Sequence, residues 1–232
     1  RSVSRGLGDV YKRQVAMGSI EMSLSNNRMV AETMARGVEA VQRQAVKGEQ
    51  TASDWDAAAY QEILTSFVGS NPETFGGGIW FEPYQYRPEQ RYFSPYCMRQ
   101  NGAVTYVDNY SLGEGVYYTD QDWYTNAANT TQKSVWSAPY YDEFAQISMV
   151  TSSAPIYDET GRLLGVATAD IDLTQMQQMV LSLDVVANGR AFLIDDTGVY
   201  IADEDSEKLL SANILEDDNP SFAALGRQIL SQ

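Results

Sequence analysis

The sequence of 232 residues contains no histidine and a single cysteine, Cys97. Without histidine the chain has no Ser-His-Asp or Cys-His catalytic apparatus, no imidazole general base and no metal site that depends on imidazole. One cysteine excludes a disulfide within the chain. An active site would have to be built from carboxylates, lysine or tyrosine, and we expect no catalytic residue, no metal site and no cofactor.

The sequence also lacks long apolar runs and has few basic residues. Because no stretch of 18 apolar residues is present, we expect any membrane-spanning segments of the protein to lie outside this chain. The 16 Lys and Arg residues are outnumbered by 31 Asp and Glu residues, which gives a net charge of −15. This charge opposes binding to nucleic acid and favours the approach of cations.

Apolar and aromatic residues, in contrast, are plentiful. Hydrophobic residues make up 44% of the chain, and the aromatic residues include 15 Tyr and 4 Trp. This content is too high for a disordered acidic segment, and the length suffices to bury a core. The chain is therefore expected to be globular, with one large domain or two smaller ones.

Two helices are predicted in the first third of the chain. Residues 1–14 (RSVSRGLGDVYKRQ) are basic and join awkwardly to the segment that starts at Val15, so we interpret them as a non-native tail. From Val15 to about residue 47 the chain carries apolar side chains at intervals of three and four, which predicts one long amphipathic stalk helix. A second helix is predicted from an N-cap at Ser53 to Gly69.

After the glycines at 76–78 the pattern changes to short β-prone runs. We expect strands at residues 79–81, 92–98, 104–110, 148–156 and 163–171. The last two runs flank a turn at 158–161, where Asp158 and Gly161 favour a hairpin, so the sheet is predicted to be antiparallel. A short helix comes next, from Leu173, with Asp172 as its cap.

A second unit is predicted after Asn188-Gly189. Residues 191–194 and 199–202 flank a turn containing Asp195 and read as another hairpin that begins a second sheet. The predicted organisation is an α+β chain with a stalk helix at 15–52, a first domain at 53–172, a connecting helix at 173–187 and an incomplete second domain at 188–232.

Five stretches of the sequence resemble the double Cache (PDC-type, PAS-like) sensor domains of bacterial chemoreceptors, histidine kinases and related transducers. They are residues 78–84 (GIWFEPY), 122–124 (DWY), 134–142 (SVWSAPYYD), 154–161 (APIYDETG) and 165–173 (GVATADIDL). The resemblance implies tandem PAS-like domains with central antiparallel sheets after a long helix. The first would be membrane-distal and hold a ligand, and the second, membrane-proximal, would be truncated here.

The resemblance also implies a role and a location. The chain would be the extracytoplasmic part of a membrane-anchored receptor, with its transmembrane helices absent here. Its output could be chemotaxis, kinase, cyclase or phosphatase activity. We further expect a homodimer formed through the long helix. A structural ectodomain that dimerises in the same way but binds nothing small is an alternative.

The residues of the predicted strand at 163–172 indicate a binding pocket independently of the resemblance. Alternation puts Leu164, Val166, Thr168 and Asp170 on one face and small residues on the other, which can lie against the long helix. A buried carboxylate at Asp170 is costly without a cation or hydrogen-bond donors. Its partner must therefore come from elsewhere in the fold or from a ligand.

The family resemblance assigns roles to further residues. In the amino-acid-sensing branch, Tyr and Asp residues that match Tyr140, Asp142 and Asp170 hold the ligand's ammonium group. A Trp that matches Trp123 holds the ligand's carboxylate together with an Arg, and that Arg position is occupied by Gln121 here. The residues expected to bind the ligand's ammonium group are thus retained, whereas the guanidinium expected to bind its carboxylate is missing.

A second departure from the family pattern lies just before this Trp. The Tyr expected seven residues earlier is Val116, with Tyr117 adjacent to it. We therefore expect a small amine, including quaternary amines, as the ligand, held by aromatic faces and carboxylates.

Other interpretations stay open at this point. One is an amino-acid sensor of the same family. Another is a carboxylate-based hydrolase using Asp142 with Asp170, or Asp170 with Asp172. Trp136 is as much a candidate core residue as a ligand contact. Four tyrosines are candidates either for lining a pocket or for covering the sheet: Tyr84, Tyr86, Tyr92 and Tyr96.

Overall fold

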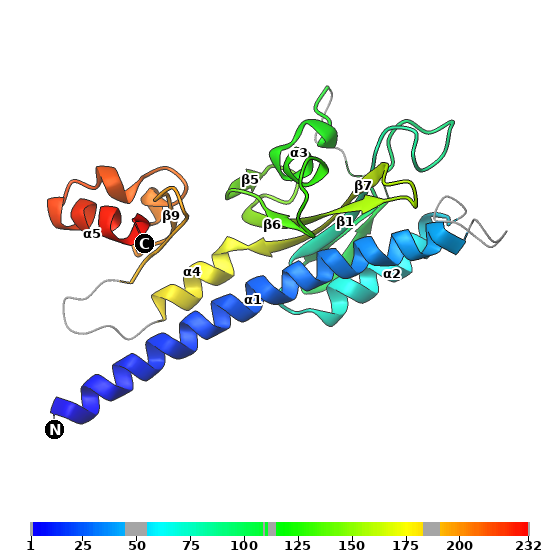
Figure 1. Ribbon diagram of the computed structural model, residues 1–232. Helices are drawn as coiled ribbons and strands as arrows, with labels where there is room; N and C mark the ends of the chain where they lie inside the picture. The colour runs from blue at the N-terminus through cyan, green and yellow to red at the C-terminus, as the bar shows by residue number, and fades with distance from the viewer. Residues whose placement is uncertain (1, 45–54, 109, 111–114, 183–190, 232) are drawn as a thin grey trace.

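A long helix, α1 (Ser2–Gln44), lies across one face of a seven-stranded antiparallel sheet (Figure 1). The computed structural model describes residues 2–44, 55–108, 110, 115–182 and 191–231. The predicted α+β class with a long N-terminal helix is confirmed. The helix begins well before residue 15, at Ser2, and residues 2–14 contain no proline that would stop it.

Helix α2 (Ala57–Ser70) packs beside α1 on the same face of the sheet. It begins at an N-cap formed by Asp56, whose Oδ1 accepts a hydrogen bond of 3.1 Å from the Ala59 amide. The start is later than the sequence predicted, and Ser53 lies outside the described residues. The buried side chains of α2 are Tyr60, Leu64 and Val68, spaced four apart on the face toward the sheet.

The sheet has the strand order β3-β2-β1-β7-β6-β4, with β5 also paired to β6. Its strands are β1 (Gly76–Phe81), β2 (Tyr96–Gln100), β3 (Ala103–Val107), β4 (Val135–Trp136), β5 (Tyr140–Asp142), β6 (Ile147–Tyr157) and β7 (Leu163–Asp172). Every pair is antiparallel, as predicted. The sequence did not predict β4 and β5, because two or three residues are too few for a detectable alternation.

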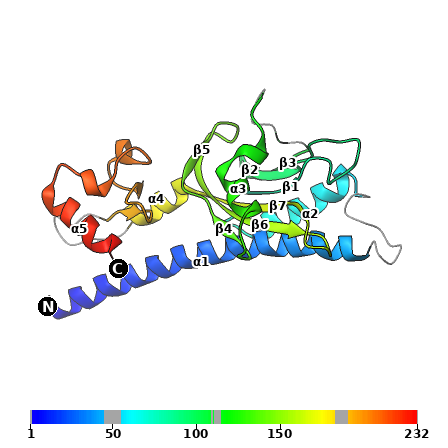
Figure 2. The same ribbon diagram turned by 45° about the horizontal axis from the view of Figure 1, so that its top comes forward.

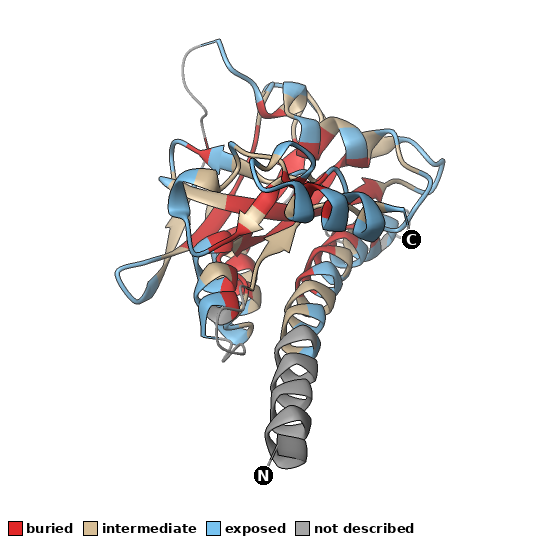
Figure 3. Ribbon diagram, turned by 90° about the vertical axis from the view of Figure 1, so that its left-hand side faces the viewer, coloured by how far each residue is buried: buried red, intermediate tan, exposed pale blue. Residues whose placement is uncertain are grey.

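The second face of the sheet is covered by the connection between β3 and β4. This connection carries η3 (Tyr118–Asp120) and helix α3 (Asp122–Ala128), which lies opposite α1 (Figure 2). Buried residues gather on the sheet and on the side of α1 that faces it (Figure 3). The sheet is thus the middle layer of three: α1 and α2 cover one of its faces, and α3 covers the other.

Strand β7 distributes its side chains between these two layers. Ala167 and Ala169 pack with Ala31 and Ala35 of α1, as the small-residue face predicted. Leu164 was predicted on the opposite face but packs in this same helix-side cluster. The reason is a register shift between Ile156 and Tyr157 of β6, which breaks the alternation at that end of the strand pair.

Polar contacts fix the position of α1 along β6. Arg36 Nη2 donates a hydrogen bond of 2.7 Å to the Pro155 carbonyl, and Glu39 Oε1 accepts one of 2.9 Å from the Tyr157 amide. Arg36 and Glu39 also form an ion pair of 3.0 Å. Because each bond joins a side chain to a specific strand residue, sliding the helix by one turn would break both.

The strand β7 leads directly into α4 (Leu173–Leu181). Asp172 Oδ1 accepts a hydrogen bond of 2.8 Å from the Thr174 amide, so the predicted cap is confirmed. Asp158 and Asp195 accept amide hydrogen bonds within their turns, also as predicted.

The residues after α4 form a small second unit. It consists of the predicted hairpin, β8 (Leu193–Ile194) with β9 (Tyr200–Ala202), followed by η4 (Ser206–Lys208), η5 (Ile214–Glu216) and α5 (Pro220–Leu230). The predicted boundary at Asn188-Gly189 lies outside the described residues. The division of the chain into the predicted domains therefore stays a prediction.

Candidate functional site

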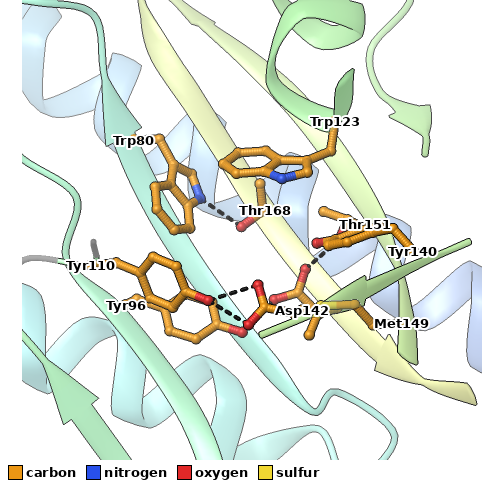
Figure 4. A pocket seen from close by; sticks show the side chains of 10 residues that line it. Trp80, Tyr96, Tyr110, Trp123, Tyr140, Asp142, Met149, Thr151 and Thr168 are labelled. Atoms are coloured by element: carbon orange, nitrogen blue, oxygen red, sulfur yellow. Dashed lines mark hydrogen bonds between the residues drawn. The ribbon is translucent and has the colours of Figure 1, made fainter. Parts of the chain in front are cut away.

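A pocket lies on the α3 side of the sheet (Figure 4). It draws side chains from five strands, from α3 and from the segment after β3. The lining residues are Trp80, Tyr96, Tyr110, Trp123, Tyr140, Asp142, Met149, Thr151, Thr168 and Asp170. They include two carboxylates, five aromatic rings and no lysine or arginine.

The buried carboxylate of Asp170 forms the floor of the pocket. Its Oδ2 accepts a hydrogen bond of 2.7 Å from the Tyr96 hydroxyl, and its Oδ1 accepts one of 2.7 Å from Thr151 Oγ1. Thr151 faces Asp170 because the two are register partners in β6 and β7. The Tyr140 hydroxyl lies 2.8 Å from Thr151 Oγ1 and extends this chain of polar groups.

Burial raises the pKa of Asp170 from 3.8 to about 7. The neighbouring carboxylate of Asp142 acts in the same direction, whereas the hydrogen bonds from Tyr96 and Thr151 act against it. A carboxylate with a pKa in this range exchanges its proton readily near neutral pH. A bound cation would replace the proton and favour the ionised form.

Asp142 supplies the second carboxylate from β5. Both of its oxygens lie 2.7 Å from the Tyr110 hydroxyl, and Oδ1 also accepts a hydrogen bond of 2.7 Å from the Ala145 amide. Tyr140 and Asp142 line the pocket together. Each carboxylate is thus held by protein donors and is directed at the same small space.

Burial raises the pKa of each tyrosine hydroxyl in the pocket, and the adjacent carboxylates raise it further. This holds for Tyr96 and Tyr110, which hydrogen-bond to the two Asp residues, and for Tyr140. The three phenols are therefore neutral hydrogen-bond donors at physiological pH. Tyr96 and Tyr110 hold the carboxylates in place without cancelling their charge, and Tyr140 contacts the hydroxyl of Thr151.

Trp80 is the centre of the aromatic wall. Its ring centroid lies 4.8 Å from that of Trp123, 5.3 Å from that of Tyr110 and 5.7 Å from that of Tyr96. Its Nε1 donates a hydrogen bond of 2.8 Å to Thr168 Oγ1, which fixes the indole over the sheet. Aromatic faces close to carboxylates form a typical environment for an organic cation.

The glycines of β1 make room for Tyr96. A Cβ added at Gly76 would lie 2.1 Å from the Tyr96 hydroxyl oxygen, and one at Gly78 would lie 2.9 Å from the Tyr96 ring. Tyr96 can therefore cross β1 and reach Asp170 only because these two positions carry no side chain. The sequence marked these glycines merely as a change of pattern.

Four of the six residues predicted to bind ligand meet in this pocket: Trp123, Tyr140, Asp142 and Asp170. Tyr117 and Gln121 are not among the lining residues. The ring of Tyr117 is 40% exposed and stacks on Tyr92 at 5.0 Å. Gln121 is the residue before α3, and its Nε2 donates a long hydrogen bond of 3.4 Å to the Tyr117 carbonyl.

Six further lining residues were not among those predicted to bind ligand: Trp80, Tyr96, Tyr110, Met149, Thr151 and Thr168. Alternation from Asp170 already put Thr168 on the pocket face. The others depend on how the strands are paired. Tyr96 had been left open, and it lines the pocket, whereas Tyr86 packs in the helix-side core and Tyr84 is exposed.

Two other open assignments are decided by the structure. Trp136 packs against the cluster of Val150, Ile171, Leu173 and Met176 and does not line the pocket. Asp172 caps α4 and is also outside the pocket lining, so it does not form a second acid-base pair with Asp170.

Comparison with known protein families places this site in a known kind of domain. The family described as "Methyl-accepting chemotaxis protein-like, first PDC sensor domain" has a model that matches residues 60–178, about half of the chain. The match includes every residue that lines the pocket.

Two curated relatives are chemotaxis proteins. The chain is 25% identical over 194 residues to the methyl-accepting chemotaxis protein McpA of Pseudomonas putida, which covers 81% of this chain and 29% of that protein. It is 38% identical over 84 residues to McpC of Bacillus subtilis, which covers 36% of this chain and 13% of that protein. The chain thus spans less than a third of either relative.

Solved structures share the fold. One, named methyl-accepting chemotaxis protein X, has a TM-score of 0.73 at 18% identity and covers 100% of this chain and 84% of its own. The ligand-binding domain of the amino acid chemoreceptor PctC of Pseudomonas aeruginosa, in complex with GABA, has a TM-score of 0.61 at 17% identity, covering 93% and 82%. In the described part of this chain, no helix combines the length and the hydropathy that crossing a bilayer requires.

Proposed function

Since this chain belongs to the family of first PDC sensor domains of methyl-accepting chemotaxis protein-like receptors, we propose that it is the extracytoplasmic sensing part of a bacterial membrane receptor. Its pocket binds a small organic cation, an amine or a quaternary amine. The observation that carries this proposal is the presence of two buried carboxylates, Asp142 and Asp170, in an aromatic pocket whose lining includes no basic side chain.

The charge balance of the pocket supports a cationic ligand. Asp142 is 7% exposed and Asp170 is 3% exposed, so solvent compensates neither carboxylate fully. Their hydrogen bonds come from neutral donors, namely hydroxyl and amide groups. An ammonium group between the two carboxylates would supply the missing positive charge and gain charge-assisted hydrogen bonds.

The aromatic wall supports the organic part of the ligand. Trp80, Trp123, Tyr96 and Tyr110 present ring faces and edges around the carboxylates. Such rings attract alkylated ammonium ions and exclude strongly hydrated metal ions, which need several oxygen ligands. The expected ligand is therefore an amine with a compact alkyl part.

An amino acid is the second candidate. PctC, which shares this fold, is described as an amino acid chemoreceptor and was solved with GABA. The indole N–H of Trp123 points into the pocket and has no hydrogen-bond partner among the described residues, so it could donate to a ligand's acceptor group (Figure 4). However, an α-carboxylate would face Asp142 and Asp170 without a guanidinium, because Gln121 stands at the position that the resemblance to the amino-acid-sensing branch assigns to Arg.

The two carboxylates are assigned to binding and not to catalysis. Both are already hydrogen-bonded to tyrosine hydroxyls, and Asp142 also holds a backbone amide, which suits fixed binding groups. In the full receptor we propose membrane anchoring through segments outside this chain and dimerisation through α1. Turnover of a bound amine would revive the hydrolase alternative.

Isothermal titration calorimetry with the purified domain tests the ligand class. The panel should contain methylammonium, ethylammonium, tetramethylammonium and choline beside glycine, alanine and GABA. We expect saturable binding of at least one amine and weaker binding of the α-amino acids. Tight binding of the α-amino acids with no amine binding would overturn the amine assignment and favour the second candidate.

A further inference from the structure

Phe144 occupies an unusual place beside the pocket. It lies in the turn between β5 and β6, its side chain is 45% exposed, and its ring centroid is 4.6 Å from that of Tyr110. Tyr110 is itself only 6% exposed and lines the pocket. A large aromatic ring therefore covers a pocket residue from the solvent side.

The pocket beneath is too small for an organic cation as it stands. The free space is about 10 Å³ for a water-sized sphere, which corresponds to about one water molecule. A ligand with several heavy atoms can occupy the site only if part of the wall moves. The part that moves will be the one whose displacement costs the least free energy.

The strand β5 is the least paired of the strands that line the pocket. The strands β1 and β7 are each hydrogen-bonded to neighbours along both edges, β1 to β2 and β7, and β7 to β1 and β6. By contrast, β5 has three residues and, in the described part of the chain, pairs only with β6. Segments with few backbone hydrogen bonds open locally at a small fraction of the global unfolding free energy.

Asp142 connects the ligand site to the turn that carries Phe144. Its side chain accepts the Ala145 amide, and its carbonyl accepts the Gln146 amide at 2.7 Å. Gln146 has a φ of 57°, which is uncommon for a residue other than glycine, so the turn needs these bonds to keep its shape. Movement of the Asp142 carboxylate toward a cation would therefore move the turn and Phe144 with it.

We propose that the β5–β6 turn is the entrance of the pocket and that Phe144, which covers Tyr110 in the empty pocket, moves aside to admit a cation and closes again once the cation lies between Asp142 and Asp170. The proposal rests on the proposed ligand-binding function. Phe144 does not touch the ligand; it controls access to it. Removing its ring should accelerate exchange of ligand more than it changes affinity.

Quenching of tryptophan fluorescence by acrylamide tests the entrance without any ligand. In a Trp55→Phe/Trp136→Phe background, the remaining reporters Trp80 and Trp123 both lie in the pocket wall. Phe144→Ala should raise their Stern–Volmer constant about threefold, since local opening controls access of a quencher to buried rings. Phe144→Leu, which keeps an apolar cover, should raise it less.

The matched control is Tyr141→Ala. Tyr141 lies on β5, three residues before Phe144, is 57% exposed and is not part of the pocket lining. Its Stern–Volmer constant should equal that of the background protein. Equal constants for Phe144→Ala and the background would overturn the role of Phe144 as the cover, whether or not an amine binds.

Stopped-flow fluorescence with tetramethylammonium then measures exchange. Phe144→Ala should raise the association and dissociation rates each by about tenfold while Kd changes by less than about threefold. If Phe144→Ala binds tetramethylammonium with the same association and dissociation rates as the wild type, the proposal that the β5–β6 turn is the entrance is contradicted. If neither tetramethylammonium nor any other amine binds to the wild-type protein, the proposed function fails, and the acrylamide experiment still decides the role of Phe144.

Discussion

The hydroxyl group of Tyr96 donates a hydrogen bond of 2.7 Å to Oδ2 of Asp170, although the two residues are separated by 74 positions in the sequence. Strand β1 lies between the strands of these two residues, so the bond passes over β1. It does so at Gly76, which is the register partner of Asp170 in β7 and of Met98 in β2. The carboxylate that defines the pocket floor is thus oriented by a residue from β2, two strands away. Its position depends on the absence of a side chain in between.

Gly76→Ala should disrupt this relationship. The new Cβ would lie 2.1 Å from the Tyr96 hydroxyl oxygen, so Tyr96 must move away from Asp170. We expect a loss of stability of about 1–3 kcal/mol, because overpacking in a core costs this much, together with weaker amine binding. Urea unfolding and calorimetry measure the two effects.

Gly69→Ala in α2 is the matched control, since nothing lies within 4 Å of the added Cβ. It should raise stability by about 0.5–1 kcal/mol through helix propensity alone and leave amine binding unchanged. Equal effects of the two substitutions would contradict the importance of the space beside Gly76.

Stability should depend on pH through Asp170. Its pKa is about 7 in the folded protein and near the ordinary value of 3.8 when unfolded. Between these values the folded state holds a proton that the unfolded chain has released, so stability falls as pH rises from 4 to 7 and then levels off. Urea unfolding from pH 4.5 to 8 should show that Asp170→Asn has lost this contribution. If the difference in the free energy of unfolding between the wild type and Asp170→Asn does not change with pH, the raised pKa of Asp170 is contradicted.

Amine affinity should depend on the same group in the opposite direction. A cation binds the ionised carboxylate, so raising the pH from 6 to 8 should strengthen binding as the proton leaves Asp170. Because the calorimetric panel contains the permanently charged tetramethylammonium ion, the titration of the ligand itself is avoided. Binding of this ion that weakens with rising pH would argue against contact with Asp170.

The bond between Trp80 and Thr168 should be measurable by a double-mutant cycle. Thr168→Val removes the acceptor and leaves the buried Trp80 N–H without a partner, at an expected cost of about 1–3 kcal/mol. In a Trp80→Phe background the same substitution should cost less, because the donor is gone. Thr168→Ser keeps the hydroxyl and is the control. Additive costs in urea unfolding would show that the bond contributes nothing.

Glu39→Ala should weaken the attachment of α1 to the sheet. Glu39 is 7% exposed and holds the Tyr157 amide, which would lose its partner. The expected cost is about 1–3 kcal/mol for an unsatisfied, partly buried amide. The exposed Glu21 on the same helix is the control, and Glu21→Ala should change the free energy of unfolding by less than about 0.5 kcal/mol. Equal free energies for both variants would mean that this contact does not hold the helix on the sheet.

Residues close together in the sequence were largely predictable. The alternation in residues 163–172 put Thr168 and Asp170 on one face. Local hydrogen bonding in turns and at helix ends identified Asp158 and Asp172 correctly. In each case the structural consequence is determined within a few residues.

Contacts that depend on strand order could not be predicted in this way. The sequence does not state that β1 lies between β2 and β7, which is what brings Trp80 and Tyr96 to Asp170. Nor does it reveal the register shift near Tyr157 that moves Leu164 to the helix side. Tyr117 and Gln121 were selected by their spacing from Trp123, but neither side chain is part of the pocket lining.

The central claim is that Asp170 binds a cation, and thermal denaturation of wild-type and Asp170→Asn proteins with an amine tests it most directly. The substitution keeps the shape of the side chain and removes a buried charge, so the variant without ligand should be at least as stable as the wild type. At an amine concentration 100 times Kd, the wild-type protein should gain about 2.7 kcal/mol of stability and show a higher Tm. We predict no such rise in Asp170→Asn, and an equal rise in both proteins would contradict cation binding at Asp170.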